Sequence, residues 1–203
     1  MKQALIIFSL SIMLMTACSS NNTPKTQYYL LNSPTLTKAS ESENKNTNKP
    51  VIVINLLELP EYLKQASLVL QLSEHQLHYA YFHMWAEPLQ TSITEGLIDD
   101  LNTIDSRYNY MAMQNPQQIK ATTEVIVKIT AFHATHQSQA ILTGSYWLQH
   151  EGNKQAKNYH FTLTTALTSD GYPHAVEKMR KIMTQLAEII SKNIAINSPP
   201  TVN

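Results

Sequence analysis

The chain has 203 residues, with 15 basic and 15 acidic side chains and a single cysteine, so its formal net charge is zero. Binding to nucleic acid requires concentrated positive charge, and this balance argues against a nucleic-acid partner. One cysteine excludes an intramolecular disulfide bond and a metal centre built from several cysteines.

The first 17 residues have the pattern of a secretory signal peptide. One positive charge at Lys2 precedes a run of apolar and small residues from Ala4 to Ala17. The run is shorter than the roughly 20 apolar residues that a membrane-spanning helix needs. We therefore expect residues 1–17 to be cleaved off rather than retained as a helical anchor.

Cys18 follows small residues, at the place where a bacterial lipobox has the cysteine that becomes lipidated. The match departs at Met15, where leucine is usual, so an ordinary signal peptide with an incidental cysteine is the alternative. Acyl chains contribute about 0.8 kcal/mol per buried methylene, and several of them give a stable anchor. Ser19 resembles the residue that follows the cysteine in lipoproteins sent on to the outer membrane, and residues 18–26 are expected to be the tether.

Residues 27–197 are expected to form one α+β domain, in which two main helices pack on a mostly antiparallel sheet. In chain order, strands are predicted at 28–31, 51–57, 67–72, 77–82, 108–113, 125–132, 141–148 and 159–167. Apolar residues at every third or fourth position predict helices from 89 to about 104 and from 173 to about 196. The polar stretch 33–50 is expected to be a surface loop, and residues 198–203 a tail.

Strands 67–72 and 77–82 flank a polar turn and predict a hairpin. Its arms have more apolar and aromatic residues than a ribbon surrounded by water should have. Either both faces of the hairpin pack inside the domain, or an exposed edge meets another protein chain.

The join between this hairpin and the first helix reads HMWAEPL, residues 83–89. We expect Trp85 to pack over the start of the helix and Pro88 to pre-set its first turn. Glu87 would place a negative charge beside the positive end of the helix dipole. Trp85, Glu87 and Pro88, together with Tyr79 and Tyr81, are the candidates for a structural role or for partner binding.

Two pairs of histidines, His75 with His78 and His133 with His136, have a spacing of three residues. On a helix this spacing would place both imidazoles on one face, where they could share a metal ion. These pairs fall instead on a turn and at a strand end, where residues three apart point to opposite sides. Solvated or half-buried imidazoles are therefore expected, and a metal-dependent hydrolase using His133 and His136 is the less favoured alternative.

Other catalytic patterns give little support for an enzyme. The chain has no nucleophile elbow, no zinc-protease motif and no glycine loop for phosphate. Glu58 and Glu61 flank Leu59-Pro60 and could be paired carboxylates, but a surface turn explains them better. We therefore predict no catalytic residue, no metal and no cofactor.

Six short motifs follow one another along the chain: the lipobox cysteine Cys18, YYLL at 28–31, LPEYL at 59–63, WAEPL at 85–89, LTGSYWL at 142–148 and SDGY at 169–172. Their order resembles the ABC-type transport auxiliary lipoproteins, the family that includes paraquat-inducible protein C. The resemblance covers essentially the whole mature chain. One departure is Met84, where relatives often have a basic residue before the tryptophan.

The resemblance implies a non-enzymatic lipoprotein, anchored by its N-terminal lipid to the periplasmic face of the outer membrane. Its partner would be a membrane-anchored protein with mammalian-cell-entry domains, in a system that moves lipids across the periplasm and supports the membrane barrier. A structural or pilot lipoprotein of another envelope machine is the alternative. A homo-oligomer that surrounds a tubular partner is suggested by analogy only.

Overall fold

The structure, a computed structural model, describes residues 24–33, 49–57, 59–113, 123–150, 152 and 155–197. Its single sheet contains eight strands. They are β1 (Gln27–Tyr29), β2 (Val51–Leu56), β3 (Ser67–Ser73), β4 (Gln76–Trp85), β5 (Asn109–Ala112), β6 (Thr123–Thr135), β7 (Gln139–His150) and β8 (Lys157–Ala166). Two long helices, α2 (Leu89–Ile104) and α3 (Tyr172–Asn197), and a short 3₁₀ turn, η2 (Glu61–Leu63), complete the described elements.

The longest strands, β6, β7 and β8, form an antiparallel meander. Alternate side chains of β6, among them Val125, Val127 and Ile129, are buried on one face of the sheet. The pairing of β6 with β7 shifts register just after Ile129. Beside this shift, a Cβ atom on Gly144 of β7 would collide with the carbonyl oxygen of Lys128 and lie 2.8 Å from Cζ of Phe161. The glycine of the LTGSYWL motif therefore allows neighbouring strands to approach closely.

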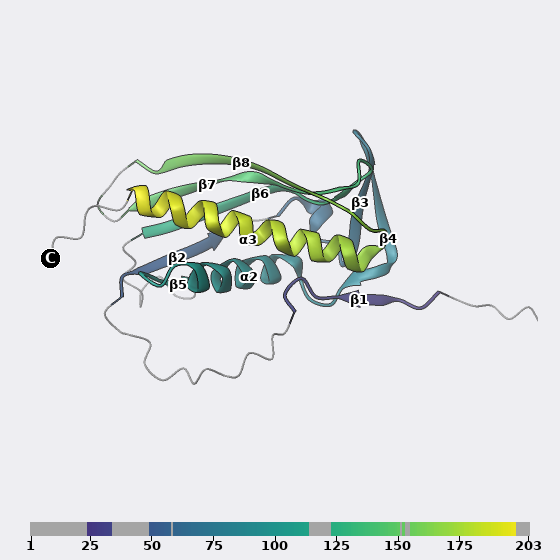
Figure 1. Cartoon of the computed structure of the whole chain (residues 1–203), viewed down its shortest axis with the longest axis horizontal. Coiled ribbons are helices and arrows are strands. Elements are labelled where there is room, and N and C mark those ends of the chain that lie inside the picture. Colours follow the sequence, from purple (N-terminus) through teal and green to yellow (C-terminus); the bar gives the residue numbers. More distant parts are fainter. Residues whose placement is uncertain are drawn as a thin grey trace, which may run out of the picture.

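The other edge of β6 supports two branches of the sheet. The first part of β6 pairs in parallel with β2, and β5 pairs in parallel on the outer side of β2. The last part of β6 pairs in parallel with β3, from which β4 and then β1 continue outward. Figure 1 shows the hairpin of β3 and β4 at the opposite end of the sheet from β5. These parallel contacts join segments that are far apart in the sequence.

Both helices lie on the same face of the sheet (Figure 1). α3 packs against β6, β7 and β8, whereas α2 packs against β2 and β5, and the two helices contact each other. Each helix turns a stripe of apolar residues towards the sheet. The stripe of α3 buries Val176, Met179, Ile182, Met183, Leu186, Ile190 and Ile194. The main core therefore lies between this helical layer and the inner face of the sheet.

The predicted α+β domain, with two helices packed on a mostly antiparallel sheet, is confirmed. The hairpin, the meander and both helices lie where the sequence patterns predicted them. α2 begins at Leu89, as predicted, and Pro88 lies immediately before it. The signal peptide, Cys18, most of the loop at 33–50, and the tail all lie outside the described residues.

Within the described part of the chain, neither helix is long and apolar enough to cross a membrane.

Candidate functional site

The corner between β4 and α2 is fixed by backbone hydrogen bonds to two other segments. The N–H of Trp85 donates to the carbonyl oxygen of Ala66 at 2.7 Å, and the N–H of Ala86 donates to that of Tyr29 at 2.9 Å. Trp85 is 7% exposed and belongs, with Leu89, to the hydrophobic core cluster. Trp85 is thus part of the core and is not available at the surface.

Pro88 and Glu87 supply the polar contacts at the start of α2. The carbonyl oxygen of Pro88 accepts hydrogen bonds from the N–H groups of Thr91, at 3.0 Å, and Ser92, at 3.2 Å. The buried hydroxyl of Ser92 donates to Oε1 of Glu87 at 2.6 Å. Because a buried hydroxyl without a partner is costly, Glu87 serves first as the acceptor for Ser92. Its charge also lies beside the positive end of the helix dipole.

The hairpin of β3 and β4 is buried at its base and exposed further out. Leu68, Val69 and Ala80 are buried, whereas Leu72 and Leu77 near the turn are exposed. Neither of the two predicted environments therefore holds for the whole hairpin.

Tyr79 and Tyr81 differ in environment, although they lie only two residues apart. Tyr79 is half-buried near Tyr62, whose pKa is raised to about 12 by burial and by the neighbouring Tyr79. Tyr81 is 68% exposed, and the adjacent Phe82 is 46% exposed. Of these two candidates, only Tyr81 presents most of its ring to the outside.

Tyr81 and Phe82 are exposed because β4 bulges at this point. Ser67 of β3 pairs with Met84, but the next residue, Leu68, pairs with Ala80, so residues 81–83 have no counterpart on β3. A bulge leaves its extra residues unpaired and bends the strand. β1 lies beside the bulge and pairs in parallel with the end of β4, with Gln27 opposite His83.

Three rings connect β1, the bulge and the start of α3. The imidazole of His83 stacks on Tyr172 with a centroid separation of 3.7 Å. Nδ1 of His83 is hydrogen-bonded to the hydroxyl of Tyr29 at 2.7 Å. This cluster of Tyr29, His83 and Tyr172 holds β1 and the bulge against α3. No local sequence pattern indicates this cluster, since its members come from three distant segments.

A surface pocket of about 340 Å³ lies between the hairpin, the turn after β6 and the start of α3. The SDGY motif forms one side of it, and Gly171 has φ = +101°, a conformation that favours glycine. Its lining is part apolar and part polar, with Leu70, Leu72, Ala134, Leu167, Tyr172 and Ala175 alongside Thr135, His136 and Asp170. A pocket with this mixed lining suits a ligand that has both apolar and polar groups.

The two histidines of the second pair, His133 and His136, lie in different environments. His133 is buried, not solvated or half-buried as predicted, and its ring lies edge-on to Tyr62. Burial lowers the pKa of His133, so its imidazole is held in the neutral form. His136, His75 and His78 are exposed. In the described part of the chain, no group of three or more His, Cys, Asp or Glu residues could hold a metal ion.

Glu61 and Asp105 take part in contacts within the fold. Glu61 is exposed and forms an ion pair with Lys64, at 2.6 Å, while Glu58 lies outside the described residues. Asp105 is buried and accepts hydrogen bonds from Arg107, Tyr110 and Ser191. This cluster was not predicted from the sequence. The close pair of Asp105 and Arg107 in a polar stretch was its only local signal.

Comparison with known proteins places the chain in a class of transport proteins. Residues 29–191 match the family model described as the ABC-type transport auxiliary lipoprotein component. The chain is 25% identical over 188 residues to the intermembrane transport lipoprotein PqiC of Escherichia coli K12, covering 93% of this chain and 96% of that protein. The protein of the same name from Shigella flexneri matches equally well.

Solved structures share the fold. A crystal structure of an uncharacterized protein superimposes with a TM-score of 0.70 at 21% identity, over 84% of this chain and 99% of the other. A protein from Xanthomonas campestris gives a TM-score of 0.60 at 13% identity, over 72% and 84% of the two chains. The architecture of sheet and paired helices therefore recurs in proteins of low sequence identity.

The chain belongs to the ABC-type transport auxiliary lipoprotein family, because the family model matches most of its length. The resemblance inferred from the six motifs is confirmed. Several of these motifs have structural roles, since WAEPL forms the corner before α2, LTGSYWL lies in β7 and SDGY leads into α3.

Proposed function

We propose that this protein is a non-enzymatic, lipid-anchored auxiliary component of an envelope lipid-transport system. In this role it docks a periplasm-spanning partner with mammalian-cell-entry domains at the outer membrane and supports the integrity of that membrane. The observation that carries the proposal is the family match over residues 29–191. The near full-length similarity to a protein named as an intermembrane transport lipoprotein supports the same role.

The environment of the buried titratable groups supports a non-enzymatic role. Catalytic acids and bases are usually found in clefts, where their pKa values are matched to a reaction. Asp105 is instead enclosed by Arg107, Tyr110 and Ser191, and His133 packs against Tyr62 outside the described pocket. Both groups act within the fold, which favours a docking protein over a hydrolase.

The proposal gives the sequence-derived candidates different parts. Trp85, Glu87 and Pro88 would hold the angle between β4 and α2, and Tyr79 would pack the base of the hairpin. Tyr81 would make contacts outside the domain, because most of its surface is exposed. The chain would be attached through acylated Cys18 to the inner leaflet of the outer membrane, which leaves the domain in the periplasm.

A pull-down tests the proposed partner. The acylated full-length chain, tagged after residue 203, is purified from detergent-solubilised envelopes of cells that express the transport system. We expect a protein with mammalian-cell-entry domains to be recovered with it. A second pull-down from the partner's side shows whether the complex survives the detergent. If the pull-down from the partner's side recovers the transporter's other subunits but not this chain, the docking role is overturned.

A further inference from the structure

The exposed aromatic rings of the described residues lie at one corner of the molecule. The large apolar side chains that are exposed include three aromatic ones: Tyr28 at 66%, Tyr81 at 68% and Phe82 at 46%. We call these three residues the aromatic corner. Tyr28 lies in β1, and the other two lie in the adjoining bulge of β4. The other exposed apolar residues are not aromatic: Leu30 follows β1, Leu72 and Leu77 lie near the hairpin turn, Leu57 and Met113 follow strands, and Ile104 and Ile196 lie at helix ends.

Strand pairing places the members of the aromatic corner close together. Gln27 pairs with His83 and Tyr28 pairs with Met84, so β1 begins just past residues 81 and 82, on the neighbouring strand. With strands about 4.8 Å apart and a rise of about 3.3 Å per residue, Tyr28 lies roughly 8–11 Å from residues 82 and 81 along the backbone. The stacked rings of His83 and Tyr172 hold the bulge against α3. The exposed rings are therefore displayed from a fixed framework.

The same corner is where the chain arrives from its N-terminal side. β1 begins at Gln27, nine positions after Cys18. Nine residues span at most about 30 Å when fully extended, and about 15–18 Å as a flexible coil. If Cys18 is acylated, its lipid keeps the start of β1 within that distance of the bilayer. The aromatic corner is then an apolar part of the domain that lies close to the membrane surface.

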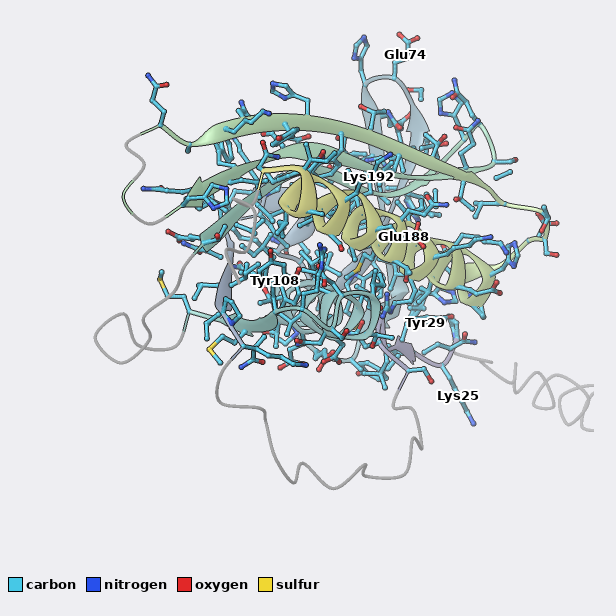
Figure 2. The ribbon with its side chains drawn as sticks, turned by 60° about the vertical axis from the view of Figure 1, so that its left-hand side comes forward. Lys25, Tyr29, Glu74, Tyr108, Glu188 and Lys192 are labelled. Carbon is cyan, nitrogen blue, oxygen red and sulfur yellow. The ribbon has the colours of Figure 1, made fainter. Side chains whose placement is uncertain are left out.

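The side chains of the corner suit the boundary between lipid and water. Aromatic residues, tyrosine above all, are enriched at this boundary, because they combine an apolar ring with a polar end. Exposed Lys25, just before β1, adds a positive charge that anionic head groups attract. Figure 2 shows Lys25 and Tyr29 at one side of the molecule and Glu74 at the far tip of the hairpin. This arrangement turns the acidic tip away from the anchored side.

We propose that the aromatic corner inserts its rings among the phospholipid head groups of the membrane that holds the acyl anchor, and so orients the domain on that surface. The inference rests on the proposed lipid anchor at Cys18. Contact with lipid places the pocket beside α3 near the membrane as well, because Tyr172 belongs both to its lining and to the ring cluster that supports the corner.

Site-directed fluorescence tests this orientation. Once Cys18 is acylated, a newly introduced cysteine is the only free thiol, because the chain has one cysteine. Tyr81→Cys carries an environment-sensitive fluorophore. Glu74→Cys at the tip of the same hairpin and Thr164→Cys on β8 are matched controls, since both positions are exposed. The acylated proteins are reconstituted into vesicles of phosphatidylethanolamine and phosphatidylglycerol that contain a lipid-borne quencher. Melting temperatures close to that of the unlabelled chain confirm that each variant is folded.

We expect the lipid-borne quencher to reduce emission from position 81 at least about twofold more than from positions 74 and 164, since rings at the interface lie several ångströms deep. Equal quenching at the three positions of an acylated, vesicle-bound protein would overturn the orientation and leave the anchor standing. Shielding of position 81 only after the partner protein is added would overturn it in favour of a protein contact. An intact mass without acyl chains would overturn the anchor and this inference together.

Discussion

At the scale of the residue, Asp105 joins three segments of the fold through one carboxylate. It lies at the end of α2 and accepts two hydrogen bonds from the Arg107 guanidinium, at 2.8 and 2.7 Å. It also accepts hydrogen bonds from the hydroxyl of Tyr110 in β5, at 3.0 Å, and from that of Ser191 in α3, at 3.2 Å. Burial tends to raise the pKa of Asp105, but the hydrogen bonds from Arg107 and Tyr110 hold that pKa below its usual value.

Replacement of Asp105 by asparagine should lower the free energy of unfolding at pH 7. The substitution keeps the shape of the side chain and removes the charge that Arg107 and the two hydroxyl groups contact. Hydrogen bonds to charged groups contribute about 1.5–3 kcal/mol each, and we expect a net loss in that range. Denaturant-induced unfolding of Asp105→Asn measures the change. Glu188→Gln, at an exposed position of α3, is the control and should change stability by less than about 0.5 kcal/mol.

Comparison of the native chain with Asp105→Asn also gives a prediction about pH. A carboxyl group whose pKa is lower in the folded state stabilises that state fully at pH values above its unfolded pKa, about 3.9 for aspartate. This contribution is lost as the pH falls through the lower, folded pKa. The stability difference between the native chain and Asp105→Asn should therefore be constant from pH 7 to about pH 5 and shrink below pH 4. A difference that stayed constant down to pH 2 would show that the charge of Asp105 does not contribute.

At the scale of the element, the contact between α2 and α3 includes a bidentate ion pair. Both terminal nitrogens of Arg180 donate to the carboxylate of Asp100 at 2.6 Å. The hydroxyl of Thr184, one turn further along α3, donates to the same carboxylate at 3.1 Å. The side chains of Asp100 and Arg180 are 13% and 28% exposed, so water screens this pair only in part. This cluster therefore adds a polar contact between the two helices to their apolar packing.

A double-mutant cycle of Arg180→Ala and Asp100→Ala should give a coupling energy of about 1–3 kcal/mol. The exposed pair of Lys64 and Glu61 provides the matched comparison. It is a single contact with an 85% exposed carboxylate, and its coupling should be at most about 0.5 kcal/mol. Chemical denaturation of the two sets of variants measures both energies. Equal coupling energies in the two cycles would mean that the bidentate geometry adds nothing to the stability of the helix pair.

The elements that the sequence predicted are those with a local pattern. The stripe of α3, the alternation in β6 and the polar turn of the hairpin each lie within one segment, so their periodicity identifies them. The parallel pairings of β6 with β2 and β3 join distant segments, and no local pattern specifies them. The bulge at 81–83 follows from a pairing mismatch with β3, so it too could not be seen in one strand.

The residues of the candidate site also divide into those that a local pattern indicates and those that only the folded chain brings together. The burial of Trp85 could be argued from its place before a helix. The contacts of Asp105 with Ser191, and of His83 with Tyr172, bridge more than 80 positions of sequence and exist only in the folded chain.

At the scale of the whole molecule, the described features that face outward concentrate at the hairpin end. The aromatic corner, the pocket beside α3 and the start of β1 are all found there. α3 begins at this end beside β4 and runs along the inner face of the sheet towards the other end, as Figure 1 shows. A chain attached near its N-terminus would thus present one end to the membrane and keep its helical layer in the periplasm.

Loss of the lipidation site should release the protein from the outer membrane. In the proposed mechanism the domain is retained there by acyl chains on Cys18, each adding about 0.8 kcal/mol of binding per buried methylene. The three exposed rings of the aromatic corner offer a much smaller apolar area, so they can orient the domain but cannot hold it alone. Cys18→Ser should therefore be found as a soluble protein or as a precursor retained in the inner membrane. Tyr81→Ser, which keeps the cysteine, should remain in the outer membrane. Immunoblots of separated membranes and periplasm measure the distribution, and an unchanged outer-membrane fraction for Cys18→Ser would show that another part of the protein is the anchor.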